Sequence, residues 1–255
     1  MKKLLIILLV TLLLTTFSLS VSQIVLIKYK LAKDYNMPEI STETDIVTPT
    51  KSDIETSAVK DNIYNAFCEK LSNENGDFAG WISIDGTNIS YPLMMSPSEP
   101  DYYLKRDFYR KSSTSGTPYI GSDCDLDSDN TIIYGHNMEN GTMFSDLLLY
   151  KNEQFFNEHP KVLIQTVSEN AEYDIIAVFK EEVHYQDESN VFRYYDYVGD
   201  LTEADFDKYV KIVKKISLYD TGVTANYGDK LISLSTCSHL SKNGRFVIVA
   251  VKKAA

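Results

Sequence analysis

The chain has 255 residues, a formal net charge of −11 at pH 7, 44% hydrophobic residues and 24% charged residues. This composition is ordinary for a globular protein, so it excludes a disordered chain and a polytopic membrane protein. The negative charge argues against a nucleic-acid-binding protein, which normally presents a basic face.

The first predicted element is an apolar N-terminal segment. Residues 4–27 carry no charge and are bracketed by Lys2 and Lys28. As a helix this run would span about 36 Å, enough to cross a hydrocarbon core of about 30 Å. Ser18-Leu19-Ser20 offers a weak signal-peptidase site, so cleavage stays open as an alternative, but no cysteine follows for a lipoprotein anchor. We expect residues 1–33 to be an uncleaved transmembrane helix, with the rest of the chain outside the cell.

Residues 34–57 are rich in Thr, Ser, Asp, Glu and Pro and lack periodic apolar positions, which predicts a solvated extracellular stalk. The folded domain is expected over residues 58–255. It opens with a helix, whose apolar face we assign to Val59, Ile63, Ala66 and Phe67.

From Trp81 onward, short β-type runs alternate with turn residues. A hairpin is predicted over 81–91, with Asp85-Gly86 at its turn. Further strands are predicted at residues 131–134, 162–167, 173–179, 230–236 and 245–251. Helices are expected over 143–150 and 202–216, the second with Thr202 and Asp205 as a near capping box. Many short strands with few helices indicate a closed barrel or a sandwich.

The strongest chemical signal lies where two of these strands end. The strand over 230–236 runs directly into Cys237, and Arg245 opens the next strand. If the two strands pair, Cys237 and Arg245 lie at the same rim of the sheet. Cys68 and Cys124 lack such a setting, and we interpret both as small buried apolar residues. An exported chain with three cysteines leaves at least one thiol unpaired unless an intermolecular bridge forms.

A histidine stands in a matching position. The strand over 131–134 is followed by Gly135 and His136, and the glycine allows the backbone to turn. A cysteine nucleophile needs an imidazole, either as a base or as the cation that stabilises its thiolate. It also needs a donor for the charge that develops on the substrate carbonyl oxygen. His136 and Arg245 would supply these roles; His239, close to Cys237 in sequence, is a rival for His136.

These segments carry a family resemblance. Ser233-Leu234-Ser235-Thr236-Cys237 resembles the sortase signature TLxTC, with serine for the first threonine, and Arg245 follows eight residues later. The segment from Thr131 to Asn137 is similar to the histidine segment of class B sortases. The likeness runs from about Phe78 to Lys252 with these elements in family order.

The resemblance implies a mainly β fold, a closed eight-stranded sortase-type barrel with flanking helices, attached to an N-terminal transmembrane helix. It implies a cysteine transpeptidase that cleaves a C-terminal sorting motif of secreted proteins after threonine, through a thioester on Cys237. The acyl group then passes to an amine of peptidoglycan or its precursor on the cell wall of Gram-positive bacteria. His136 matches the acid/base partner, and Arg245 the oxyanion or substrate-orienting donor. Tyr134, Ser235 and Thr236 match positions that line the substrate groove.

Two other functions stay open from the residues themselves. An exported cysteine hydrolase would resolve the thioester with water, and a non-catalytic exported binding module would use the cysteine, histidine and arginine structurally. No cofactor or metal is expected. The alternating aspartates of 123–129 resemble the start of an EF-hand loop, but Ser128 replaces its glycine and Tyr134 its last glutamate. His159 and His184 have no partner pattern, and we expect both at the surface.

Overall fold

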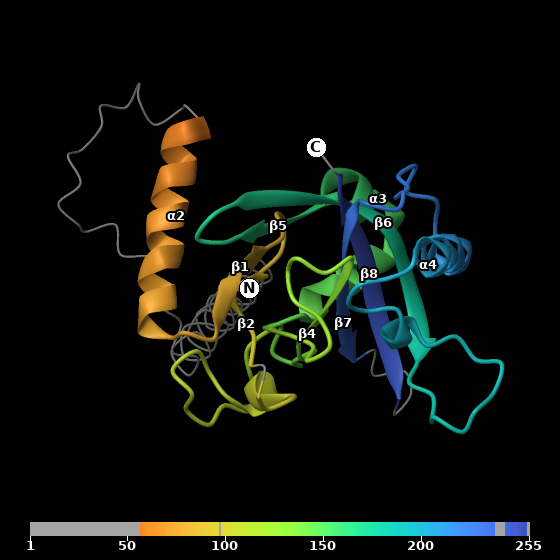
Figure 1. Cartoon of the computed structure of the whole chain (residues 1–255), viewed down its shortest axis with the longest axis horizontal. Helices are drawn as coiled ribbons and strands as arrows, with labels where there is room; N and C mark the ends of the chain where they lie inside the picture. Colours follow the sequence, from red (N-terminus) through yellow and green to blue (C-terminus); the bar gives the residue numbers. More distant parts are fainter. Residues whose placement is uncertain (1–56, 97, 238–242, 254–255) are drawn as a thin grey trace, which may run out of the picture. The chain divides into compact units, whose positions relative to one another are not determined.

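The computed structural model describes residues 57–96, 98–237 and 243–253, so the predicted membrane helix and nearly all of the stalk lie outside the described part (Figure 1). Eight strands close into one barrel in the order β1-β2-β3-β4-β7-β8-β6-β5, and β1 pairs with β5 to complete it. The strands are β1 Phe78–Ser83, β2 Ser90–Met94, β3 Tyr119–Ile120, β4 Asn130–Tyr134, β5 Lys161–Gln165, β6 Asn170–Glu182, β7 Lys230–Cys237 and β8 Gly244–Lys252. The closed eight-stranded barrel implied by the resemblance is therefore confirmed. No helix within the described ranges combines the length and apolarity that a membrane span requires.

Short helices connect or cover these strands. They are α2 Ser57–Glu74, η1 Tyr102–Lys105, η2 Ser145–Lys151, α3 Glu153–Glu158, η3 Tyr194–Asp196 and α4 Glu203–Ile216, where η denotes a 3₁₀-helix. The helix expected over 143–150 is a 3₁₀-helix that begins later. Met143 has a φ of 57°, which no right-handed helix accepts, and Phe144 at the N-cap offers no capping side chain.

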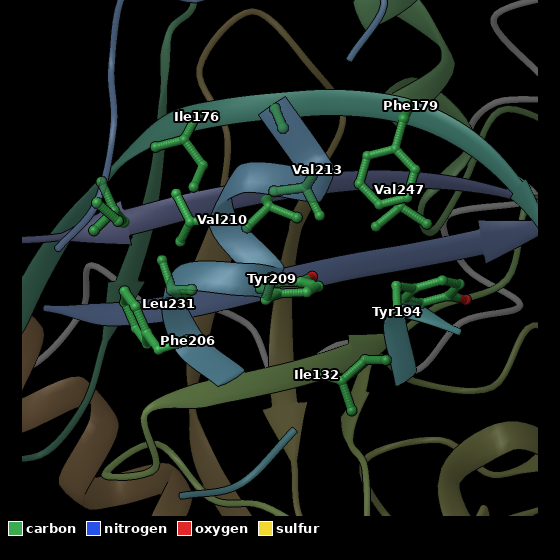
Figure 2. Packing of buried hydrophobic residues seen from close by; sticks show 14 residues of the cluster. Ile132, Ile176, Phe179, Tyr194, Phe206, Tyr209, Val210, Val213, Leu231 and Val247 are labelled. Atoms are coloured by element: carbon green, nitrogen blue, oxygen red, sulfur yellow. The ribbon is translucent and has the colours of Figure 1, made fainter. Parts of the chain in front are cut away.

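Helix α4 confirms the prediction for 202–216. The hydroxyl of Thr202 accepts a hydrogen bond from the backbone N–H of Asp205, as a helix N-cap should. The face of α4 that packs on the sheet buries Phe206, Tyr209 and Val213. These side chains join a cluster that includes residues of β4, β6, β7 and β8 (Figure 2). This cluster is an apolar core outside the barrel, between α4 and the strands that carry the predicted site.

The packing of α4 gives a stability prediction. Phe206 is fully buried, so replacing it with alanine removes apolar contacts and leaves a cavity that the barrel strands fill only in part. We expect the Phe206→Ala variant to lose about 3–5 kcal/mol of unfolding free energy, measured by chemical denaturation. Asp207→Ala, at an exposed position on the same helix, should change it by about 0.5 kcal/mol or less. Equal losses in the two variants would contradict this account of the packing.

The alternation along β7 determines which side chains face α4. Ser233, Ser235 and Cys237 lie on the α4 side, since Ser233 hydrogen-bonds Tyr209 of that helix and successive strand residues point to opposite faces. Leu234 and Thr236 point to the barrel interior. Cys237 therefore ends its strand on the outer face of the barrel wall.

Helix α2 packs against the barrel through a different face from the one predicted. Cys68 and Leu71 are buried there, and Phe67 sets its ring edge-on to Trp81 at 5.2 Å. Ala66 is exposed, so its assignment to the apolar face is wrong. The side chains of Val59 and Ile63 lie outside the described residues. The helical period continues past Phe67 to Leu71. The buried residues lie near the C-terminal end of α2 because β1 begins shortly after that end.

Candidate active site

The parallel pairing of β4 with β7 brings the predicted histidine and cysteine to one rim. Tyr134 is in register with Ser235, so His136 and Cys237 each lie two residues beyond a matched pair on neighbouring strands. Neighbouring strands run about 4.8 Å apart, so the two segments leave the sheet side by side. On the other flank of β7, Cys237 is in register with Arg245 of β8, as the strand pattern predicted. All three predicted residues therefore lie at one end of three adjacent strands.

Three hydrogen bonds join the ends of β4 and β7 beyond the last ladder pair. The backbone N–H of Gly135 donates to the carbonyl of Ser235 at 3.2 Å, and Thr236 Oγ1 donates to the carbonyl of Gly135 at 2.7 Å. Asn137 Nδ2 then donates to the carbonyl of Cys237 itself at 2.7 Å. The segment that carries His136 is thus fixed to the segment that carries Cys237.

Gly135 fits this junction because the ring of Phe144 packs against it. A Cβ at this position would lie 2.6 Å from ring atoms of Phe144, closer than side chains normally approach. The backbone N–H of Phe144 donates to the carbonyl of His136 at 2.8 Å, which holds the turn from the other side. The glycine is therefore needed for close approach, and not only for a turn.

The imidazole of His136 has a defined orientation. Its Nε2 lies 2.8 Å from the carbonyl oxygen of Leu104 in η1. Because a carbonyl only accepts, Nε2 carries the proton, and Nδ1 is the ring nitrogen left for proton transfer. In the described part of the chain no carboxylate contacts this ring, so a backbone carbonyl occupies the place that an orienting aspartate takes in serine-protease triads.

A cleft of about 540 Å³ lies over this rim and is lined by His136, Cys237 and Arg245 together. One wall comes from the β2–β4 connections, including Leu104 and Tyr119, and the other from the β6–β7 connection. This size and the presence of convergent polar groups suit an extended peptide or a small ligand.

The predicted groove residues Tyr134, Ser235 and Thr236 also line the cleft. The ring of Tyr134 lies 5.6 Å from that of Tyr119, and burial raises the pKa of Tyr134, partly opposed by the positive charge of Arg245. The Thr236 hydroxyl is already used by the carbonyl of Gly135. Thr236 is 2% exposed, so it supports the cleft chiefly by holding the Gly135 carbonyl.

Ser235 is buried, and its Oγ lies 2.8 Å from the hydroxyl of Tyr194 in η3. Burial raises the pKa of Tyr194 to about 12, against the opposing effects of the Ser235 hydrogen bond and the Arg245 charge. Tyr194 therefore stays neutral across physiological pH and holds η3 onto β7. This pairing closes the floor of the cleft next to Cys237.

Sequence reasoning missed Leu104, Tyr194 and Asn137 as contributors to this site. The first acts through its backbone carbonyl, which carries no residue signature. Tyr194 is separated from Ser235 by 41 residues, a contact that only the fold reveals. Asn137 stands next to His136. An amide side chain beside a candidate histidine at a strand end was the one sequence signal that could have suggested a role for Asn137 in the site.

The interpretation as small buried residues is confirmed for Cys68 and only in part for Cys124, which is half-buried and accepts the backbone N–H of Ile132 at 3.3 Å. None of the three is in a disulfide. Cys68 is fully buried, and burial raises the pKa of its thiol to about 11. Cys124 is half-buried against the outer core, and burial raises its pKa as well. Both thiols stay protonated at neutral pH and are poor nucleophiles.

The acidic loop at 123–129 uses its carboxylates internally. Asp125 accepts hydrogen bonds from the backbone of Asp127 and Ser128, and Asp129 pairs with Lys230 at 3.0 Å. No group of three or more potential ligands converges on a metal position within the described ranges.

The prediction for His184 is wrong in one respect, because this residue has partners. Its ring lies 3.0 Å from Glu188 and 3.5 Å from Glu181, and Glu188 above all raises its pKa. His159 is half-buried and packs on Phe155 at 4.7 Å. His239, the rival for His136, lies outside the described residues.

Comparison with known proteins agrees with this geometry. The sortase domain model matches residues 82–253. Sortase B of Listeria monocytogenes is 34% identical over 183 residues, covering 70% of each protein. Sortase B of Staphylococcus aureus is 27% identical over 186 residues, covering 71% of this chain and 72% of that protein. The crystal structure of Clostridium perfringens sortase B superposes with a TM-score of 0.63 at 31% identity, covering 73% of this chain and 99% of the other.

Proposed function

The chain belongs to the sortase family and is a cysteine transpeptidase that anchors proteins to the cell wall, and from this premise we propose that Cys237, His136 and Arg245 carry out the reaction. The observation that carries the proposal is the shared rim. Parallel β4–β7 and antiparallel β7–β8 pairing put the three residues on adjacent strand ends around one cleft. No other cysteine in the described ranges lines this cleft.

In the first half-reaction, Cys237 Sγ attacks the carbonyl carbon of the threonine in a sorting motif. The peptide bond after this threonine breaks, and a thioester forms on Cys237. The departing amine is a poor leaving group and takes a proton from a general acid. His136 first takes the thiol proton of Cys237 on Nδ1 and then donates that proton to the departing amine, while its Nε2–H stays held by the Leu104 carbonyl.

In the second half-reaction an incoming amine attacks the thioester carbon. The C–S bond breaks, an amide forms, and His136 accepts the proton that the amine loses. We propose an amine of peptidoglycan or its precursor as the acceptor, with secreted proteins as the acyl donors. The cleft is open to the rim where Cys237 ends its strand, which leaves the thioester accessible to a second substrate.

Arg245 is proposed to stabilise the oxyanion or to orient the substrate carbonyl. Its guanidinium Nη1 donates to the neighbouring Gly244 carbonyl at 3.1 Å. The remaining N–H groups of the guanidinium are left for a ligand in the cleft. Tyr134, Ser235 and Thr236 are proposed to contact the sorting motif. Tyr134 is partly exposed for this contact, while Ser235 and Thr236 are buried and also support the cleft wall through Tyr194 and the Gly135 carbonyl.

The N-terminal segment is proposed to anchor the enzyme in the cell membrane by a single span, with the catalytic domain outside. The support is its uncharged run of residues 4–27, long enough for the hydrocarbon core. The acidic stalk over 34–57 would then separate the barrel from the membrane.

A peptide panel tests the proposed reaction. The chain from Ser52 onward is mixed with quenched-fluorescent peptides carrying NPQTN-, LPxTG- and PPxTG-like motifs, with and without an added amine. We expect the enzyme to cleave peptides of one motif class. When amine is present, we expect the acyl product to be an amide of that amine. Cleavage to a free acid that amine never intercepts would favour the hydrolase alternative. No cleavage, together with a Cys237 that iodoacetamide does not alkylate, would favour the binding module.

A further inference from the structure

We propose that a polar cluster at the end of helix α2 positions the imidazole of His136 through the short helix η1. The cluster consists of Asn75, Asp77, Tyr103 and Arg110, and it acts through the backbone carbonyl of Leu104. These are positioning residues that do not touch the substrate. The inference rests on the proposed role of His136 as the acid/base partner.

The cluster is a closed set of hydrogen bonds around one phenol. Tyr103 OH donates to Asp77 Oδ2 at 2.7 Å and accepts from Asn75 Nδ2 at 2.9 Å. Arg110 Nη2 donates to Asn75 Oδ1 at 2.7 Å and to Asp77 Oδ2 at 3.0 Å. Asn75 Nδ2 also donates to the carbonyl of Phe108 at 2.7 Å. One carboxylate and one guanidinium balance each other, so the cluster carries no net charge.

The inner half of this set is buried. Tyr103 is fully buried, Asn75 is 4% exposed, and Phe108 packs with the α2 residues Cys68 and Leu71. Burial raises the pKa of Tyr103 to about 12, so its hydroxyl keeps the proton that Asp77 accepts. The side chains of Asp77 and Arg110 are 27% and 48% exposed, so the buried pair Asn75 and Tyr103 fixes the arrangement, because losing either one leaves a buried polar group of the other unpaired.

The cluster controls the position of Leu104 because Tyr103 is the preceding residue. The side chain of Tyr103 is held toward α2, and its carbonyl accepts the backbone N–H of Thr117 at 2.9 Å. The backbone of η1 is therefore fixed on both sides of the Tyr103–Leu104 peptide. The Leu104 carbonyl then accepts Nε2–H of His136 at 2.8 Å.

Gly116 packs closely against the same peptide. A Cβ at Gly116 would lie 2.4 Å from the Leu104 oxygen and 2.7 Å from the Tyr103 oxygen, and its φ of 59° suits glycine. The carbonyl that orients His136 thus follows a residue held by the polar cluster, and it packs against a loop position where only glycine fits.

This arrangement matters because the ring of His136 makes only this one hydrogen bond within the described part of the chain. A histidine whose tautomer is not fixed divides between two forms, and only one presents Nδ1 free for proton transfer. A small displacement of η1 would lengthen the Leu104 contact and release the ring. The end of α2, far from Cys237 in sequence, would then set the fraction of enzyme that is ready to react.

The test uses the full-length chain in detergent with ¹⁵N-labelled histidine. Tyr103→Phe removes the central hydroxyl and keeps the ring. We expect kcat for sorting-peptide turnover to fall about fivefold to tenfold, because the two hydrogen bonds of this hydroxyl are lost, with KM within twofold. The imidazole ¹⁵N resonances of His136 should shift from one tautomer toward a mixture. Arg110→Asn, at a half-exposed position whose φ of 62° asparagine tolerates, should change both readouts in the same direction.

Tyr102→Phe is the matched control, because it removes a hydroxyl from the same short helix outside the cluster. It should leave kcat and the ¹⁵N resonances unchanged. A folded Tyr103→Phe or Arg110→Asn variant with parental resonances and parental kcat would overturn the inference. So would a fall in kcat that only matches a fall in the folded fraction, measured by circular dichroism. His136→Ala separates the two proposals: if it keeps activity, the proposed function of His136 fails, whatever the cluster does.

Discussion

Replacing Cys237 with alanine is expected to abolish both peptide cleavage and transpeptidation. Without the thiol no thioester forms, and the cleft keeps only its capacity to bind and polarise the substrate. Removal of a covalent nucleophile lowers turnover by at least about 10⁴-fold in enzymes of comparable chemistry. The loss should appear in kcat, measured with the fluorescent peptide, and no acyl-enzyme should accumulate by intact-mass spectrometry. Peptide affinity should stay close to that of the parent.

The fold gives this prediction a matched control. Cys124→Ser also removes a thiol, but Cys124 packs half-buried against the outer core, and burial raises its pKa. It should retain full turnover and still form the acyl-enzyme. Iodoacetamide should modify Cys237 before either of the other cysteines, because Cys68 is fully buried. Persistent acyl-enzyme in Cys237→Ala would place the nucleophile elsewhere and refute the mechanism.

The β architecture was predictable because short apolar runs and turn residues are local signals. The strands over 130–134, 230–237 and 244–252 each read as an apolar run that ends in a polar residue. The juxtaposition of Cys237 with Arg245 followed from pairing two neighbouring runs. The family resemblance implied that His136 is the acid/base partner, but its position beside them depends on the parallel β4–β7 pairing, which the residue patterns did not predict and the structure shows.

The parts that escaped prediction depend on backbone groups and distant loops. The Leu104 carbonyl orients His136, yet every residue has a carbonyl. Tyr103 and Asn75 meet across 28 positions through the packing of α2 on the barrel. The partners of His184 were in principle visible, since Glu181 and Glu188 lie three residues before and four after it. The late start of η2 follows from the left-handed backbone of Met143, a conformation that the identity of this residue does not predict.

Replacing Arg245 with alanine should have the second-largest effect, and it distinguishes the two roles proposed for this residue. A donor to the developing oxyanion acts mainly in the transition state, so its loss lowers kcat by about 10²–10³-fold with little change in KM. A donor that only orients the substrate binds ground state and transition state alike, so its loss raises KM instead. Arg245→Lys keeps the charge but loses the planar fork, and should recover only part of the lost activity.

The alkylation rate of Cys237 decides whether an inactive Arg245→Ala enzyme has lost the oxyanion donor or the site itself. Arg245 is half-buried and faces Cys237 in the β7–β8 register, so truncation leaves the backbone pairing in place. We expect iodoacetamide to modify Cys237 at a rate within a fewfold of the parent while kcat collapses, because alkylation forms no oxyanion. A parallel loss of alkylation would show that Arg245 acts on the thiolate, and unchanged kcat would remove it from the mechanism. The Arg245→Lys variant keeps a positive charge beside the thiol, so iodoacetamide should modify its Cys237 at the parental rate under either role. Any loss of kcat in this variant then measures the contribution of the planar guanidinium geometry alone.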